Sequence, residues 1–216
     1  MKFFDSLGPN PRLVRMFMLE KGITVPAEQI DIMGGANRRP PYTERNPAGQ
    51  LPALELDNGL FLGETVAICE YLEDKNPNPP LIGRTPEEKA ETRMWTRRIE
   101  LKITGPLADG FRFGEGIAMF KDRMRTLPEA SAGLKAIAAD GSAWIDGQLA
   151  GKQWVCGNRF TLADIVLYAV LDFGAGVGQP RNPEHKNLTS WFERIGKRPT
   201  AEASIHPAAK AGGMRA

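Results

Sequence analysis

The hydrophobic positions at the start of the chain change from a strand-like run to a helical spacing. Residues 2–4 include two adjacent phenylalanines, and after a Gly-Pro break the apolar residues of 11–21 recur at helical intervals. Asn10 stands just before this pattern and is a favoured N-cap residue, followed by a proline suited to the first helical turn. The pattern therefore predicts a strand at 2–4 and a helix over 11–21 that Asn10 caps.

The next fifty residues continue this mixture of extended and helical patterns. The turn sequence Asp57-Asn58-Gly59 separates two apolar runs, which predicts a β-hairpin. The predicted elements are an extended segment at 23–32, a short helix at 38–45, strands at 51–56 and 60–62, and a helix at 64–75. A strand–helix–strand unit followed by a hairpin and a helix makes a small α/β domain.

A proline-rich stretch at 76–80 ends the mixture, and strand patterns nearly vanish after it. Residues 161–164 form a variant capping box with Asp at its fourth position, and the helix that follows is apolar on every side, which predicts burial. The predicted helices of this part are 88–105, one or two within 122–150, 160–173 and 188–197.

These patterns divide the chain into two domains. We expect an α/β domain at 1–76, a linker at 77–85 and an all-helical domain at 86–216. With 216 residues, 42% of them hydrophobic and 25% charged, the chain is long enough to bury a core, and wholesale disorder is excluded.

Charge and special residues narrow the possible functions. Lys and Arg total 28 against 26 Asp and Glu, so the net charge of +2 gives no reason to expect a polyanion partner such as nucleic acid. Two cysteines and two histidines give no metal-ligand cluster, so we expect no metal, and a Ser-His-Asp hydrolase would have to use His185 or His206. Without a 20-residue apolar stretch or the apolar run of a signal peptide, we expect a soluble, cytoplasmic protein with no membrane partner.

Three segments resemble motifs of the glutathione transferase family. Residues 46–56 read NPAGQLPALEL and residues 63–72 read GETVAICEYL, as in the N-terminal domain of that family, while residues 160–165, FTLADI, are similar to a motif of its C-terminal domain. Their order and spacing extend the resemblance over most of the chain. It implies an α/β thioredoxin-like N-terminal domain plus an all-α C-terminal domain, a homodimer, and glutathione as co-substrate.

The first motif concerns how a peptide could be held. An exposed strand edge can bind a short peptide such as glutathione through backbone hydrogen bonds. The resemblance implies that the Leu51-Pro52 peptide bond is cis and that Leu51 pairs with the cysteinyl backbone of glutathione, and we place Gln50 in the same site. The alternative is that Pro52 simply opens a strand in the trans form, as most prolines do.

The second motif concerns an anion site at a helix start. Glu64 and Thr65 follow a predicted strand, and the first turn of a helix offers free N–H groups and a partial positive charge. Thr65 could therefore hold the γ-glutamyl carboxylate of glutathione, and Glu64 its ammonium group. The alternative is that Thr65 merely caps its own helix.

Basic and polar side chains occur again before the predicted helix at 38–45. Asn37 and Arg39 could hold the glycyl carboxylate of glutathione, since many relatives of the family carry His or Lys in this stretch. The alternative is that these side chains are simply solvated.

The chemistry of the family needs glutathione as thiolate, and a free thiol is only slightly ionised at neutral pH. The loop 5–10 contains no Cys, and no Tyr occurs before Tyr42, so Ser6 and Asn10 are the candidate activators. Asn10 is the first choice, because Pro9-Asn10 resembles the sequence of an Asn-using branch of the family. Cys69 lies in the apolar pattern of a helix and Cys156 lies outside the loop, so we expect neither to react.

A second substrate is expected between the domains, where pockets commonly form. Phe111 and Phe113 are candidates to line it, because the glycines around them interrupt the helical pattern; the alternative is ordinary core packing. The predicted function is transfer of glutathione to small hydrophobic electrophiles in detoxification. The alternatives are glutathione-dependent reduction of disulfides or peroxides, and a non-catalytic glutathione-binding domain.

Overall fold

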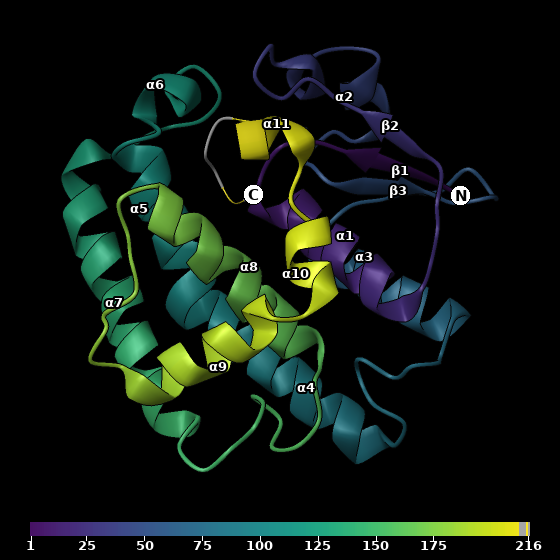
Figure 1. Ribbon diagram of the computed structural model, residues 1–216. Helices are drawn as coiled ribbons and strands as arrows, with labels where there is room; N and C mark the ends of the chain where they lie inside the picture. The colour runs from purple at the N-terminus through teal and green to yellow at the C-terminus, as the bar shows by residue number, and fades with distance from the viewer. Residues whose placement is uncertain (212–214, 216) are drawn as a thin grey trace.

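The computed structural model describes residues 1–211 and residue 215. Figure 1 shows a small sheet with its helices on one side of the molecule and a larger group of helices on the other. The predicted order of an α/β part followed by an all-helical part is confirmed. Residues 77–85, where the linker was predicted, contain neither helix nor strand.

The sheet has four strands in the order β2-β1-β3-β4. Their bounds are β1 Lys2–Asp5, β2 Ala27–Gln29, β3 Ala53–Glu55 and β4 Phe61–Leu62. β1 runs parallel to β2, as the strand–helix–strand pattern predicts, and antiparallel to β3, which forms the predicted hairpin with β4.

Alternating side chains of the strands enter two different clusters. Phe3 and Leu54 join the main core, together with α1 (Pro9–Lys21) and α3 (Thr65–Lys75). Phe4 and Ala53 face a smaller cluster that contains Tyr42 of the short helix α2 (Tyr42–Arg45), which follows the 3-10 turn η1 (Ala36–Arg38).

In the second part of the described chain, every named element is a helix or a helical turn. Its elements are α4 Pro86–Ile99, the π-helical turn η2 Glu100–Thr104, α5 Gly105–Phe113, α6 Ile117–Phe120, the 3-10 turn η3 Pro128–Ala130, α7 Ser131–Gln148, α8 Leu162–Gly176, α9 Lys186–Gly196, α10 Pro199–Ala203 and α11 Pro207–Ala211. The sequence patterns predicted α4, α7, α8 and α9 but missed α5, α6, α10 and α11. Pro106 and the glycines of 105–114 hide the period of α5, and the other three helices are too short to show one.

A π-helical turn occupies the end of the helix that was predicted at 88–105 and separates α4 from α5. Pro106 has no N–H to donate within a continuous helix, and the chain widens just before it over Glu100–Thr104. The carbonyl group of Lys102 packs against Gly141 of α7, where a Cβ atom would overlap the Lys102 oxygen. Gly141 is therefore needed for the close approach of α7 to this turn.

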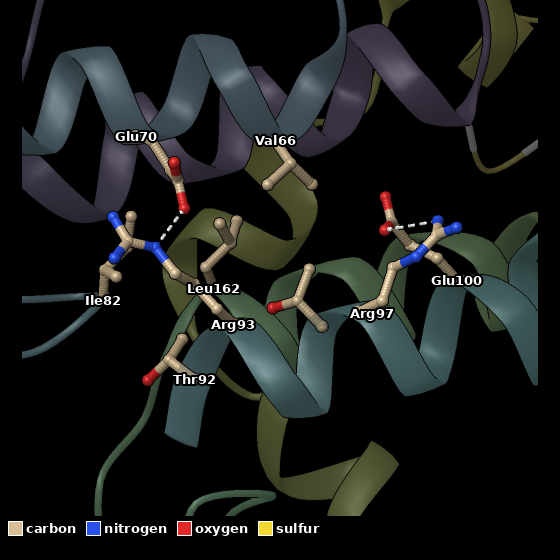
Figure 2. A pocket seen from close by; sticks show the side chains of 9 residues that line it. Val66, Glu70, Ile82, Thr92, Arg93, Arg97, Glu100 and Leu162 are labelled. Carbon is tan, nitrogen blue, oxygen red and sulfur yellow. Dashed lines mark hydrogen bonds and ion pairs between the residues drawn. The ribbon is translucent and has the colours of Figure 1, made fainter. Parts of the chain in front are cut away.

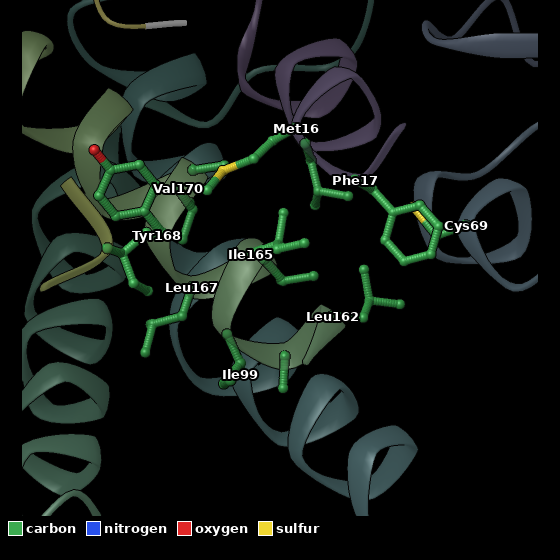
Figure 3. Close-up of a cluster of buried hydrophobic side chains, with 14 of the residues drawn as sticks. Met16, Phe17, Cys69, Ile99, Leu162, Ile165, Leu167, Tyr168 and Val170 are labelled. Atoms are coloured by element: carbon green, nitrogen blue, oxygen red, sulfur yellow. The ribbon is translucent and has the colours of Figure 1, made fainter. Parts of the chain in front are cut away.

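The two parts share one hydrophobic core. Figure 3 shows Met16 and Phe17 of α1 and Cys69 of α3 next to Leu162 and Ile165 of α8. This packing holds α1 and α8 in a fixed relation.

Burial in the same core raises the pKa of the Cys69 thiol well above its ordinary value, as expected for an unreactive cysteine.

The predicted capping box at the start of α8 is confirmed. Thr161 is the N-cap, and the Asp164 carboxylate accepts the Thr161 N–H at 2.9 Å. Asp164 is fully buried and also accepts the Val155 N–H at 2.9 Å and the Trp191 Nε1–H at 2.8 Å. Burial raises the pKa of Asp164 to about 6. This one carboxylate thus joins α8 to the preceding loop and to α9.

No helix within residues 1–211 is long and apolar enough to cross a membrane.

Candidate functional site

The register of the sheet brings the predicted site segments to one edge. Phe4 of β1 lies opposite Ala53 of β3, and Leu54 lies opposite Leu62 of β4. Because β1 is antiparallel to β3, and β3 to β4, the residues after β1, before β3 and after β4 leave the sheet at the same end. The parallel strand β2 also ends there. The starts of α1 and α3, the Leu51-Pro52 segment and the loop to η1 therefore meet at this edge.

Asn10 lies in the first turn of α1 rather than before it. Gly8 is the N-cap residue, and the Asn10 side chain makes no capping bond, so the predicted capping role is wrong. The helix starts earlier because Gly8 adopts a φ of 135° and Pro9 accepts a helical φ without needing a hydrogen bond. The half-buried Asn10 amide has no hydrogen-bond partner within the described chain.

The first turn of α1 is unusually poor in backbone donors. Pro9 and Pro11 have no N–H, and the Arg12 N–H donates to the Gly8 carbonyl at 3.2 Å. Of the first three helical residues, only Asn10 can offer an N–H to an anion, from its backbone and from its side chain.

Ser6 is fully engaged in the protein. Its side chain is 2% exposed, and its hydroxyl donates to the Ile30 carbonyl at 2.7 Å. Its N–H donates to the Asp5 carboxylate at 2.8 Å, and its carbonyl accepts from Arg15. A hydroxyl already used in this way is a poorer donor to a sulfur than the free amide of Asn10.

The Leu51-Pro52 peptide bond is cis, as the resemblance implies. The preceding carbonyl, that of the exposed residue Gln50, accepts the Tyr42 hydroxyl at 2.6 Å and the Asn46 amide at 2.9 Å, which explains the Asn of the motif. The N–H and carbonyl of Leu51 have no partner within the described residues. An unpaired backbone at this point is what a bound peptide requires.

Glu64, the residue before α3, has an unusual backbone conformation, with φ 64° and ψ 124°. Among the residues that the structure describes, it is the one residue other than glycine that has a positive φ. Such a conformation costs about 1–3 kcal/mol and is typical of functional sites. The Glu64 side chain is exposed, and no ion pair is recorded for it within residues 1–211.

Thr65 is the first helical residue of α3, so it does not cap the helix with its own side chain. The backbone N–H groups of residues 65–67 have no helical partner, because the first helical bond is donated by Ile68 to the Glu64 carbonyl at 3.0 Å. Unlike α1, α3 therefore presents several backbone donors, together with the Thr65 hydroxyl.

Asn37 and Arg39 differ in how far a ligand could reach them. Asn37 is 1% exposed, and its amide donates to the Gly49 carbonyl at 2.6 Å, so it fixes the loop beside the Leu51 segment. Arg39 is exposed and donates to the Gly34 carbonyl at 2.7 Å. Arg39 is thus the more accessible of the two for a carboxylate.

Phe111 and Phe113 lie in the last turn of α5. The expected interruption is wrong at Gly110, where α5 continues and packs closely on α7, but the helix does end at Phe113, just before Gly114. The Phe111 ring stands edge-on to Phe173 of α8 at a centroid distance of 5.2 Å, at the margin of the core. Phe113 is half-buried.

A shallow groove of about 160 Å³ lies between the two domains. Figure 2 shows Val66 and Glu70 of α3 facing Arg93 and Arg97 of α4, with Glu70 accepting from Arg93 Nε at 2.7 Å. Phe111 and Phe113 do not line it, so it is a different surface from the predicted substrate pocket.

Within the described residues, the possible metal-ligating side chains are not grouped together, and both cysteines are buried. Within residues 1–211, no three His, Cys, Asp or Glu side chains are grouped to hold a metal ion. Cys156 is 4% exposed, and burial raises the pKa of its thiol. Neither cysteine belongs to the loop before α1.

The sequence analysis missed one feature near the site. Arg38, Arg112 and Arg123 come from three separate segments, and the two latter charges both act on Arg38. Only the Arg38-Arg39 pair is visible in the sequence, since nothing in the pattern links it to residues more than 70 positions away.

Known proteins resemble the chain over most of its length. Residues 3–80 match the family model "Glutathione S-transferase, N-terminal domain", and residues 142–199 match "Glutathione S-transferase, C-terminal domain". "Glutathione S-transferase 2" of Saccharomyces cerevisiae is 30% identical over 90% of this chain and 84% of its own length. "FtsZ-localized protein A" of Caulobacter vibrioides is 28% identical over 89% and 85%, respectively. The crystal structure of Gtt2 from S. cerevisiae superposes with a TM-score of 0.89 at 30% identity, covering 95% of this chain and all of that one.

Proposed function

The chain belongs to the glutathione S-transferase family, and from that premise we propose that it conjugates glutathione to small electrophiles, using Asn10 to stabilise the thiolate. The family implies glutathione as co-substrate, and the thioredoxin-like α/β domain with its all-helical partner is the architecture of that family. The conjugation reaction and the role of Asn10 are our proposal.

The observation that carries the proposal is the set of unpaired polar groups at one sheet edge. The amide of Asn10, the backbone of Leu51 and the first-turn donors of α3 all lack partners in the described chain. Leaving such groups unpaired is costly unless a ligand or water satisfies them. Glutathione offers a thiol, a cysteinyl peptide unit and a γ-glutamyl carboxylate, one for each.

In the proposed complex, Thr65 and the start of α3 hold the γ-glutamyl carboxylate, and Glu64 pairs with its ammonium group. Leu51 pairs with the cysteinyl backbone beside Gln50 and Pro52. Arg39 holds the glycyl carboxylate, while Asn37 keeps the underlying loop in place.

Asn10 then donates its side-chain amide to the sulfur. Its hydrogen bond and the partial positive charge of the α1 terminus favour the thiolate, and the thiol proton passes to water. The thiolate attacks an electrophilic carbon, forms a carbon–sulfur bond and expels the leaving group with its electron pair. Phe111 and Phe113 are the proposed apolar contacts for the second substrate.

One kinetic panel tests this function. At fixed glutathione, the protein is assayed with 1-chloro-2,4-dinitrobenzene, a model disulfide and cumene hydroperoxide. Conjugation of the first supports the proposal, and turnover of only the other two supports reduction instead. Measurable glutathione binding with no turnover would place the chain with non-catalytic members of the fold.

The Cys69→Ala, Cys156→Ala double variant should keep the conjugating activity, because neither thiol takes part.

Binding is tested separately. Thr65→Ala removes one donor to a charged group, which is worth about 1.5–3 kcal/mol, so the affinity for glutathione should fall about tenfold or more by calorimetry. Unchanged affinity would contradict the assignment of the α3 terminus.

Assembly, location and domain limits complete the proposal. We propose a homodimer, since symmetric dimers are the commonest oligomers, and a cytoplasmic protein that acts in detoxification. Light scattering that gives a mass near 23.7 kDa at micromolar concentration would refute the dimer. The proposed domains are 1–76 and 86–216, joined by a linker at 77–85.

A further inference from the structure

Three arginines gather where the two domains face each other beside the proposed glutathione site. Arg38 ends η1, Arg112 lies in the last turn of α5, and Arg123 follows α6. Arg123 Nη2 donates to the Met33 carbonyl in the loop that leads to η1, at 3.2 Å, so this loop and the segment after α6 are in contact. We call Arg38, Arg112 and Arg123 the arginine cluster.

The arginine cluster has a surplus of positive charge. Arg112 pairs with Asp109 at 2.8 Å, but no carboxylate partner is recorded for Arg38 or Arg123 within the described residues. The Arg38 Nε atom is buried without a hydrogen-bond partner. Burial lowers the pKa of Arg38, and the positive charges of Arg123 and Arg112 lower it further. A partly buried cation with cationic neighbours is unfavourable by itself, and an anion placed among these groups would relieve it.

Arg38 lies next to the segment that we propose holds glutathione. Its Nη1 donates to the Ala48 carbonyl at 3.3 Å, and its side chain lies against Gly49, just before the segment proposed to hold glutathione. Glutathione has one glycyl carboxylate, for which Arg39 is the proposed partner. Three further guanidinium groups therefore exceed what glutathione alone requires.

Apolar groups accompany the charges. The Arg112 guanidinium lies 5.8 Å from the centre of the Phe120 ring, which stands edge-on to Phe111 at 6.1 Å. Met33 is 57% exposed and Met124 is 37% exposed. A ligand of this surface would combine an apolar body with a negative group.

We propose that the second substrate is an apolar electrophile carrying a carboxylate or similar anionic group, which the arginine cluster binds while the thiolate attacks. This inference rests on the proposed function and adds the charge of the substrate. The reaction is unchanged: a carbon–sulfur bond forms, and the leaving group departs with the electron pair. Arg112 and Arg123 position the substrate and do not touch the reacting atoms.

The test uses two electrophiles that differ in charge, 4-chloro-3-nitrobenzoate and 4-chloro-3-nitrobenzamide. Each loses chloride to the thiolate, and each kcat/KM is divided by the rate of the uncatalysed reaction. The wild-type ratio of benzoate to benzamide should be about ten or more at low salt and should fall as salt is added. The Arg112→Gln, Arg123→Gln double variant should lower this ratio about tenfold. Arg84→Gln, an exposed arginine of the interdomain segment, should leave it within twofold.

The outcomes separate the two proposals. Conversion of the benzamide with a ratio near one, or a ratio that the double variant does not change, overturns the inference and leaves the transferase function standing. An equal loss for both substrates with a raised KM for glutathione means that the cluster serves glutathione, which also overturns the inference. If neither compound is converted, calorimetry with 3-nitrobenzoate and 3-nitrobenzamide at saturating glutathione decides. Binding of the benzoate about tenfold tighter, lost in the double variant, supports the cluster, and equal binding overturns it.

Discussion

Replacement of Asn10 by Ala tests the chemistry of the site most directly. The substitution removes the side-chain amide but keeps the backbone N–H of residue 10. Because Pro9 and Pro11 on either side have no N–H, this is the one backbone donor left among the first three residues of α1. A hydrogen bond to a charged group contributes about 1.5–3 kcal/mol, and about 1.4 kcal/mol corresponds to one pH unit. The pKa of enzyme-bound glutathione should therefore rise by about one to two pH units.

The assay is a pH–rate profile of conjugation, together with the ultraviolet absorbance of the bound thiolate. Below both pKa values, the thiolate population of Asn10→Ala should fall about ten- to a hundredfold, and kcat/KM should fall with it. The deficit should shrink as the pH rises, since thiolate then forms without help. Stability should stay within about 0.5 kcal/mol of wild type, because Asn10 makes no capping bond.

Two further variants separate the possible roles. Asn10→Asp keeps the size and suits the positive end of α1, so the protein should remain stable, yet activity should be lower than in Asn10→Ala because a carboxylate repels a thiolate. Ser6→Ala leaves the Ile30 carbonyl without its 2.7 Å partner and should cost about 1–3 kcal/mol of stability, with the thiol pKa unchanged. A wild-type thiol pKa in both Asn10 variants, or a raised one in Ser6→Ala, would refute the assignment.

Three other comparisons test the fold of the protein. Glu64→Gly relieves the φ of 64° and should be about 1 kcal/mol more stable than Glu64→Ala in chemical denaturation, while both bind glutathione more weakly; equal stability would mean that Glu64 is not strained. Gly141→Ala places a methyl group against the Lys102 carbonyl and should cost about 2 kcal/mol or more, whereas Gly133→Ala on the same helix meets open space and should be neutral or stabilising by up to about 1 kcal/mol; similar melting temperatures would contradict this packing. Burial raises the pKa of Asp164 to about 6, so the folded state binds a proton at this group more tightly than the unfolded state does. The resulting contribution to the free energy of unfolding is complete below about pH 4 and is lost as the pH rises through 6. The stability of wild type relative to Asp164→Asn should accordingly decrease by up to about 3 kcal/mol between pH 4 and 7, and an increase would show that the sign is wrong.

Local sequence was enough to predict the elements that rest on short-range signals. The capping box at Thr161 fixes the start of α8 by contacts between residues three positions apart, and the apolar run after it makes the helix buried wherever it packs. The hairpin at 57–59 and the breaks around it likewise set the alternation of strands and helices. The site segments could also be found in the sequence, because the motifs at 46–56 and 63–72 are continuous.

The exact start of α1 and the role of a glycine within α5 were predicted wrongly from the sequence. Asn10 is a good N-cap residue by preference, but Gly8 can adopt a positive φ, and Pro9 needs no hydrogen-bond partner, so the helix begins two residues earlier. In the same way, the glycine at 110 was expected to interrupt α5. It is instead a contact point with α7, since a missing side chain allows two helices to approach.

Residue types and local periods determined most of the elements and the two-part order, and the resemblance of three motifs to a family implied glutathione as the ligand. The tertiary structure decided which groups remain available: Ser6 is occupied by Ile30, Asn37 by Gly49, and Asn10 is left free. It also decided that Arg38, Arg112 and Arg123 share one surface, because that depends on how the helical domain docks against the sheet. Hydrogen-bond partners and charge neighbours are set by segments far apart in the chain, and a period of two or 3.6 residues carries no information about them.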